Sequence, residues 1–175
     1  ALAASRIDGI VVPPGRVFSY HHAVGPPTKA RGFVLGSELH DGSLKPGIGG
    51  GCCQVSNLLY ALALLSGLEI VQRHRHGLDL FPDSGRTMPF GCGATVYFPS
   101  MDLRFRNPHP FPVRVGLTIE DGELVGRMAA HDPVPETYEI FEISGVIEKS
   151  GNLWMRENRV GRRTFGRRPD PLSEG

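Results

Sequence analysis

The sequence feature that most constrains the fold is residues 47–77, which join a glycine run to an apolar segment and then to a basic segment. The apolar residues after the glycines follow the i, i+3, i+4, i+7 spacing of a core-facing helix: Val55, Leu58, Leu59, Leu62 and Leu65. Gly67 then stands where a left-handed C-terminal cap is expected. The continuous apolar part is far shorter than the roughly 20 residues that a membrane helix needs. The pattern therefore predicts one principal buried helix and no membrane span in this chain.

The start of this helix carries the chemistry. The glycines that precede it, Gly50 and Gly51 among them, permit a sharp turn onto the helix. Cys53 then faces unpaired N–H groups and the positive end of the helix dipole, which is expected to lower the pKa of its thiol. The same N–H groups could hold the oxyanion of a tetrahedral intermediate. His76 arrives from a later segment as the predicted base, so Cys53 and His76 form the predicted catalytic pair of a cysteine acyl-transfer site.

Other roles for the cysteines stay open at this point. Cys52 and Cys53 could be small core residues, as free cysteines often are. The chain holds three cysteines, so at least one thiol is free, and a bridge between Cys52 and Cys92 is possible. His74 and His76 fall on one face of a predicted strand, but no Cys-x-x-Cys or His-Glu-x-x-His spacing accompanies them. We therefore predict no metal and no other cofactor.

Three ordered segments resemble the VanW family. The central segment resembles the family signature of a glycine triplet, one apolar residue, Cys-Gln-Val-Ser and a helix, and here reads GGGCCQVSNLLYALALLSGLEIVQRHRH. The upstream segment resembles the family's Pro-Gly-x-x-Phe-Ser block with its Val-Gly turn, and reads VVPPGRVFSYHHAVGPPTKARGF. The downstream segment resembles the Ala-Thr-Val and Asp-Leu-x-Phe-x-Asn blocks, and reads GATVYFPSMDLRFRN. The resemblance covers residues 3–127.

The resemblance implies a bacterial cell-wall context and a link to vancomycin resistance. It also implies transpeptidase activity of the L,D type on peptidoglycan stem peptides, carried by the motif cysteine. That cysteine maps to Cys53, because Cys52 stands where the family usually has isoleucine. The family's arginine–histidine pair maps to Arg73 and His76.

One departure from the family pattern concerns the orientation of the histidine. The family commonly has aspartate before Ala-Thr-Val, and here that position is Gly93. The group that orients His76 would then be a carboxylate from elsewhere, a backbone carbonyl, or nothing. The carboxylates considered for this role are those of Asp79, Asp83 and Asp102.

The residues predicted to contact substrate lie around the helix start and in the segments that follow it. Arg86 could recognise the carboxylate of a peptide stem, although a solvated arginine is the alternative. The full predicted set is Gly50, Gly51, Gln54, Ser56, Arg73 and Arg86.

The predicted fold is α+β and loop-rich, with a mixed or antiparallel sheet packed against the one principal helix. The 23 glycines and 15 prolines favour such a turn-rich sheet protein over a helical bundle. Strands are expected at residues 10–12, 16–20, 33–40, 69–75, 94–98, 103–106, 111–119, 123–129 and 138–148. His21 and His22 follow the second of these strands. Adjacent residues of extended chain point in different directions and could not easily bind one metal, so we expect surface or supporting roles for both. Residues 1–135 form the predicted VanW-like domain, and residues 136–175 form a strand extension and basic tail, in the same domain or appended.

Charge and composition exclude few classes of binding partner. The net charge is +1, so bulk electrostatics indicate no particular partner. The arginines of the C-terminal tail are not interleaved with aromatics, which favours a solvated edge strand over a nucleic-acid site. The predicted partners are peptidoglycan stem peptides or precursors, in an extracytoplasmic or cell-wall location, with a cytoplasmic location and the oligomeric state left open. Two functions remain: a Cys–His transpeptidase or endopeptidase, and a non-catalytic peptidoglycan-binding or resistance module.

Overall fold

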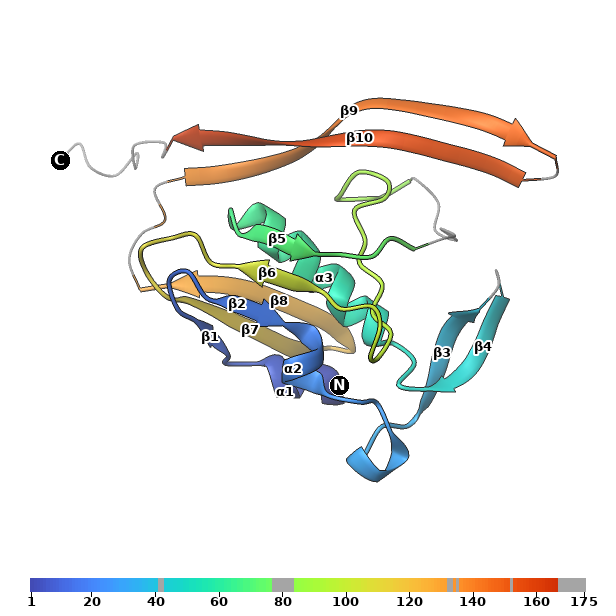
Figure 1. Ribbon diagram of the computed structural model, residues 1–175, viewed down its shortest axis with the longest axis horizontal. Helices are drawn as coiled ribbons and strands as arrows, with labels where there is room; N and C mark the ends of the chain where they lie inside the picture. The colour runs from blue at the N-terminus through green and yellow to red at the C-terminus, as the bar shows by residue number, and fades with distance from the viewer. Residues whose placement is uncertain (41–42, 77–83, 132–133, 135, 152, 167–175) are drawn as a thin grey trace.

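The computed structural model describes residues 1–40, 43–76, 84–131, 134, 136–151 and 153–166 (Figure 1). Within this part of the chain, four small antiparallel sheets surround one long helix, α3 (Cys52–Leu65). The predicted α+β, loop-rich fold with one principal helix is therefore confirmed. No helix among the described residues is long and apolar enough to cross a membrane.

The first two sheets each have three strands. One has the order β1–β7–β8, with β1 at Val11–Val12, β7 at Val113–Glu120 and β8 at Glu123–Ala130. The other has the order β2–β6–β5, with β2 at Val17–Ser19, β6 at Arg104–Arg106 and β5 at Glu69–Gln72. In both sheets strands far apart in the sequence are neighbours, so the N-terminal segment is held by the middle of the chain.

The remaining elements are two hairpins and three short helical segments. The hairpins are β3–β4, from Leu35–His40 and Ser43–Ile48, and β9–β10, from Glu136–Ser150 and Leu153–Gly166. The helical segments are α1 (Leu2–Ile7), α2 (Tyr20–Val24) and the 3-10 turn η1 (Lys29–Arg31). Strand β4 is not among the predicted strands, because Pro46 and Gly47 break the usual strand pattern.

Helix α3 packs against the core along part of the predicted apolar stripe. Val55 and Leu59 are buried, together with Ala63, whereas Leu65 is exposed. Strand β8 lies so close that a Cβ atom on Gly126 would come within 3 Å of the Leu58 and Leu62 side chains. The helix ends as expected, because Gly67 adopts a φ of +73° directly after it. Across the adjacent sheet, the Phe18 and Phe105 rings stack at 4.6 Å between centroids.

The predicted strand at residues 94–98 is wrong. Only two isolated bridges form there, His74 with Thr95 and Tyr97 with Met101. The reason is that α3 side chains take the backbone groups that a sheet partner would use. The Asn57 side chain accepts from the Ala94 N–H, and the Ser56 hydroxyl donates to the Ala94 carbonyl. Residues 93–98 therefore lie against the helix without forming a strand, and we call them the helix-bound segment.

The predicted strand at residues 16–20 ends one residue early, and His21 and His22 lie in helix α2 instead. Ser19 is the N-cap of this helix, and its hydroxyl accepts the N–H of His22 at 3.1 Å. The serine thereby turns the chain from strand β2 into a helical turn. His21 becomes half-buried, whereas His22 stays exposed.

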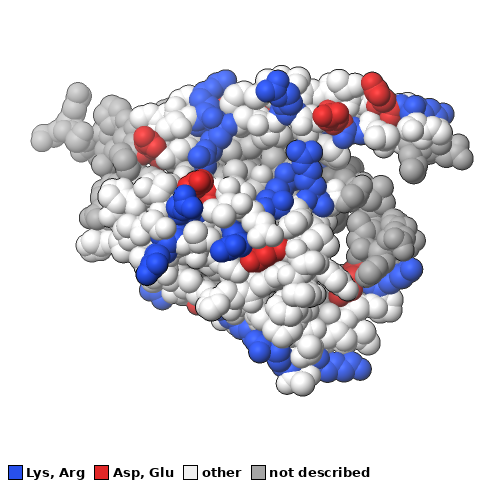
Figure 2. All heavy atoms as spheres, viewed as in Figure 1, with Lys and Arg blue, Asp and Glu red and all other residues white. Residues whose placement is uncertain are grey.

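The C-terminal hairpin is more closely tied to the domain than a solvated edge strand would be. Arg162 donates to the Leu68 carbonyl at 2.9 Å and lies over the Tyr138 ring, which covers Gly67. Three arginines of β10 stack on aromatic rings: Arg156 lies over Phe90, and Arg162 and Arg163 lie over Tyr138 and Phe141 of β9. The predicted irregularity near Gly145 falls at residue 143, which the register skips. Basic and acidic side chains are interspersed on the face seen in Figure 2, in keeping with the small net charge.

A buried asparagine joins the first sheet to the turn that follows strand β6. Asn107 is fully buried, and its Nδ2 donates to the carbonyls of Val12 and Phe111, both at 2.8 Å. Its Oδ1 accepts the N–H of His109 at 3.0 Å. The amide therefore binds three backbone groups from β1 and from the turn that follows β6.

We expect Asn107→Ala to lower the free energy of unfolding by about 2–4 kcal/mol, because it leaves buried carbonyls and an N–H without partners. Urea unfolding followed by circular dichroism measures the change. Arg104→Ala, at an exposed position of strand β6, is the control and should stay within about 0.5 kcal/mol of the parent. An Asn107→Ala protein as stable as this control would contradict the assigned role.

Candidate functional site

Glycines build the turn that presents the cysteines. Gly49 and Gly51 have φ values of +90° and +89°, which favour glycine over any residue with a side chain. Gly50 instead lies against the backbone of Gly36 in strand β3, where a Cβ atom would come within 2.2 Å of the Gly36 carbonyl carbon. The predicted sharp turn is confirmed, and the β3–β4 hairpin is packed backbone to backbone against it.

The N–H groups at the start of α3 are partly engaged. Cys52 donates its N–H to the Gly49 carbonyl at 3.2 Å, and Gln54 donates to the Gly51 carbonyl at 3.1 Å. The N–H of Cys53 donates to no backbone carbonyl in the part of the chain that the structure describes. Of the N–H groups predicted to form an oxyanion hole, that of Cys53 itself is therefore the available donor. The Gln54 side chain is exposed beside it.

The Cys53 thiol is half-buried against the helix-bound segment. Its Sγ lies 3.8 Å from the Val96 carbonyl oxygen, a weak S–H donation. Burial raises the pKa of Cys53 above its ordinary value, and the nearby Glu38 carboxylate adds to the rise. The expectation that this pKa lies below its ordinary value is therefore wrong, and loss of solvation is the largest cause of the rise.

His76 is held by two side chains on opposite sides of its ring. Its Nε2 lies 3.1 Å from Oδ1 of Asn57, and its Nδ1 lies 2.6 Å from Oγ1 of Thr95. The Asn57 atom is an oxygen that accepts the Ala94 N–H at 2.7 Å. Since that oxygen can only accept, Nε2 carries the proton and Nδ1 is left to accept from the Thr95 hydroxyl.

Gly93 lies where a carboxylate would touch this histidine. A Cβ atom on Gly93 would lie 3.1 Å from Cδ2 of His76 and 3.0 Å from Oδ1 of Asn57. In this chain the Asn57 amide occupies that side of the ring. Asp102 does not orient His76, because it binds Ser19 and His21. The predictions for Asp79 and Asp83 lie outside the described residues.

Sequence reasoning missed Asn57 and Thr95. Asn57 lies one helical turn after Cys53, so the i, i+4 spacing places both on one face of α3 and could have indicated it. Thr95 had no comparable signal, because its role follows from the path of the helix-bound segment. Both residues connect the cysteine-bearing helix to His76.

The other predicted site residues support the backbone around this site. Ser56 is fully buried and donates to the Ala94 carbonyl at 2.6 Å. Arg73 donates to the Gly93 carbonyl at 2.7 Å and to the Gly91 carbonyl, and it lies over the Tyr60 ring at 4.9 Å. Arg86 lies 5.6 Å above the Phe90 ring. The structure thus gathers Ser56 and Arg73 around the helix-bound segment, with Arg86 stacked farther along the chain.

The cysteines do not form a bridge, and Cys52, Cys53 and Cys92 are all free thiols. Among the residues that the structure describes, no three His, Cys, Asp or Glu side chains are placed to hold a metal ion. His74 instead lies 3.0 Å from the Gln72 amide nitrogen through its Nε2.

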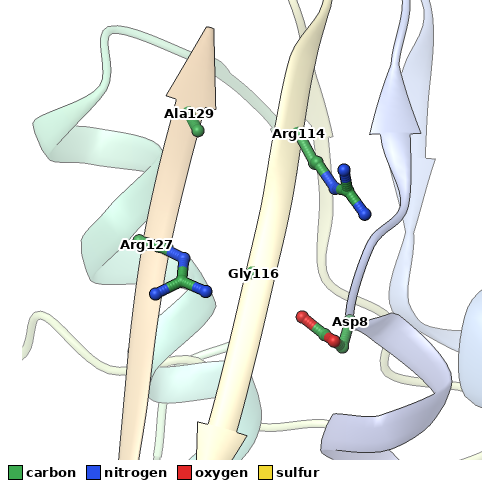
Figure 3. A pocket seen from close by; sticks show the side chains of 5 residues that line it. All are labelled: Asp8, Arg114, Gly116, Arg127 and Ala129. Atoms are coloured by element: carbon green, nitrogen blue, oxygen red, sulfur yellow. The ribbon is translucent and has the colours of Figure 1, made fainter.

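A separate cavity of about 300 Å³ lies on the outer face of strands β7 and β8 (Figure 3). Its lining residues are Asp8, Arg114, Gly116, Arg127 and Ala129. Both arginines and the aspartate are exposed, and none of the five belongs to the site around Cys53. The cavity is therefore not part of the candidate site.

Comparison with known proteins finds the same family that the sequence motifs resemble. The chain matches the family model described as VanW like protein over residues 1–129. It is 30% identical over 154 residues to the vancomycin B-type resistance protein VanW of Enterococcus faecalis, covering 87% of this chain and 56% of that protein. It is 32% identical over 137 residues to the uncharacterized protein YoaR of Bacillus subtilis, covering 77% of this chain and 43% of that protein. The chain thus spans about half the length of these relatives. No solved structure matches it.

The contact between Gly50 and Gly36 can be tested by a single added methyl group. We expect Gly50→Ala to lower the free energy of unfolding by about 1–3 kcal/mol, because the new Cβ would overlap the Gly36 backbone. Gly166→Ala, where no atom lies within 4 Å of the added Cβ, is the matched control. Chemical unfolding of both variants measures the difference, and equal stabilities would rule out the close packing described above.

The raised pKa of the Cys53 thiol can be tested by its rate of alkylation. Because the thiol is protonated at neutral pH, iodoacetamide should modify Cys53 slowly at pH 7 and faster as the pH rises, with a midpoint above that of free cysteine. Peptide mapping by mass spectrometry separates Cys53 from Cys52 and Cys92, whose pKa values are also raised by burial. A midpoint below that of free cysteine would show that the helix start stabilises the thiolate after all.

Proposed function

The chain belongs to the VanW family, and on that premise we propose that it is a cysteine acyltransferase acting on peptidoglycan stem peptides, of the L,D-transpeptidase type. Cys53 is the proposed nucleophile and His76 the proposed base. The observation that carries the proposal is the helix-bound segment, which contacts Cys53 through Val96 and His76 through Thr95. One short stretch of backbone thus places a thiol and an imidazole in a single neighbourhood.

In the first half of the reaction, the Cys53 sulfur attacks a peptide carbonyl of the donor stem. The thiol proton passes to Nδ1 of His76, with the Thr95 hydroxyl as the relay, because that hydroxyl already lies 2.6 Å from Nδ1. Asn57 fixes the ring by accepting from Nε2. The Cys53 N–H stabilises the oxyanion, and the histidine returns the proton to the departing amine.

In the second half, an acceptor amine from another stem attacks the thioester. A C–N bond forms, the C–S bond breaks, and Cys53 recovers its proton. Water as the acceptor would give an endopeptidase by the same chemistry, so the nature of the acceptor decides between transpeptidase and hydrolase. The exposed Gln54 side chain is the proposed contact with the peptide, with Gly50 and Gly51 as the backbone wall of the site.

The relatives suggest the biological setting. One of them carries vancomycin resistance in its name, and we propose that this chain likewise takes part in the response of the cell wall to glycopeptide antibiotics. An extracytoplasmic or cell-wall location follows from the proposed substrate, since stem peptides are cross-linked outside the cytoplasm.

A non-catalytic module that binds peptidoglycan is the second candidate. Two observations favour it: Gly93 supplies no carboxylate beside His76, and burial raises the pKa of the Cys53 thiol. In that case the same site would bind a stem peptide without forming a thioester. The two candidates differ in whether a covalent intermediate forms on Cys53.

The test uses purified protein, a tetrapeptide stem as acyl donor and a second stem carrying a free side-chain amine as acceptor, with products read by mass spectrometry. We expect Cys53→Ala to lower product formation by at least about a thousandfold and His76→Gln by about a hundredfold. Cys92→Ala is the control for general loss of a thiol and should retain activity.

Activity that survives Cys53→Ala would overturn the assigned nucleophile. Stem-peptide binding without turnover in the parent protein, unchanged in Cys53→Ala, would support the binding module in place of the enzyme.

A further inference from the structure

A histidine other than His76, His21, lies close to the carboxylate of Asp102. Asp102 is held by two donors, the Ser19 hydroxyl at 2.6 Å and the N–H of His21 at 2.9 Å. Its Oδ1 lies 3.9 Å from Nδ1 of His21, an ion-pair contact rather than a hydrogen bond. The two side chains are 13% and 12% exposed, so the pair is sheltered but still reached by solvent. A carboxylate in this position stabilises an imidazolium when one forms.

One segment links this pair to the proposed nucleophile. The helix-bound segment contacts His76 at Thr95, Cys53 at Val96, and the His21 ring at Phe98, whose centroid is 5.2 Å away. The contacts to the two histidines and to Cys53 therefore all fall within four consecutive residues, 95–98, with the contact to Cys53 between the other two in the sequence.

A second contact links the same region to the helix start. The hydroxyl of Tyr20, the neighbour of His21 in α2, lies 3.4 Å from the Cys52 carbonyl. The Tyr20 and His21 rings are in turn 6.3 Å apart. Helix α2 thus reaches the first turn of α3, and His21 is the neighbour of the residue that makes this contact.

We propose that His21 is a second acid–base residue of the site, one that serves the acyl acceptor, with Asp102 as its positioning residue. This inference rests on the proposed acyl transfer at Cys53. His76 would take part in forming the thioester, and His21 in the attack of the acyl acceptor on that thioester. Because the two histidines contact different residues of the helix-bound segment, each half-reaction would have its own imidazole.

The proposed step balances without any other reagent. The nitrogen of the acceptor amine attacks the carbonyl carbon of the Cys53 thioester, and His21 removes a proton from that nitrogen. The C–N bond forms as the C–S bond breaks, and the thiolate of Cys53 takes a proton from the imidazolium of His21. The products are an amide and a free thiol, and His21 is again neutral.

The experiment separates the two half-reactions with p-nitrophenyl acetate as the acyl donor and glycinamide as the acceptor. Release of nitrophenolate reports acylation, peptide mapping by mass spectrometry locates the acetyl group on Cys53, and its loss on adding glycinamide reports the second half. We expect His21→Gln to acylate within about threefold of the parent but to release the acetyl group at least about tenfold more slowly. His22→Gln, its exposed neighbour in α2, is the matched control and should release it at the parent rate.

Asp102→Asn should also slow release of the acetyl group. The double variant, His21→Gln with Asp102→Asn, should be no slower than His21→Gln alone, because Asp102 acts through His21. A merely structural role of Asp102 would instead add to the effect of His21→Gln. His21→Asn repeats the measurement if His21→Gln lowers the unfolding temperature.

Release by His21→Gln at the rate of His22→Gln, with Cys53 acetylated in both, would overturn the role of His21 and leave the acyl transfer standing. A parent protein in which Cys53 is never acetylated would overturn the acyl transfer, and the role of His21 with it.

Discussion

The structure around Cys53 depends on two hydrogen bonds that one turn of α3 makes to a single residue, Ala94. Ser56 satisfies its carbonyl and Asn57 satisfies its N–H. These side chains do for the segment what a neighbouring strand would do in a sheet, so the chain lies along the helix without belonging to a ladder. Because the segment is fixed there, Val96 meets the thiol and Thr95 meets the imidazole.

The fold was largely predictable because its main signals are local. The apolar spacing of α3, the glycines before it and the turn at residues 120–122 each follow from backbone sterics or periodicity within a few residues. Asp121 and Gly122, with φ values of 49° and 86°, form the tight turn that the sequence indicated. The α+β class and the central helix could therefore be read from the chain.

The site was less predictable because it depends on competition between distant groups. A helix start lowers the pKa of a thiol, but burial raises it, and the depth of burial depends on segments far from Cys53 in the sequence. Residues 94–98 also depend on distant groups. Their alternating pattern favours a strand, but Ser56 and Asn57 hydrogen-bond the backbone carbonyl and N–H of Ala94. The helix that holds His21 was not predicted, because the Ser19 cap ends the strand and begins α2 within a single residue.

The contact between Gly36 and Gly50 has a consequence for how such a chain can evolve. In most packed pairs, a larger residue on one side is compensated by a smaller one on the other, but neither glycine can become smaller. A substitution at either position can be accommodated only if the whole β3–β4 hairpin shifts away from the helix start. The end of the hairpin that contacts the helix start is thus expected to resist sequence drift, because a change there would move the turn that presents the cysteines.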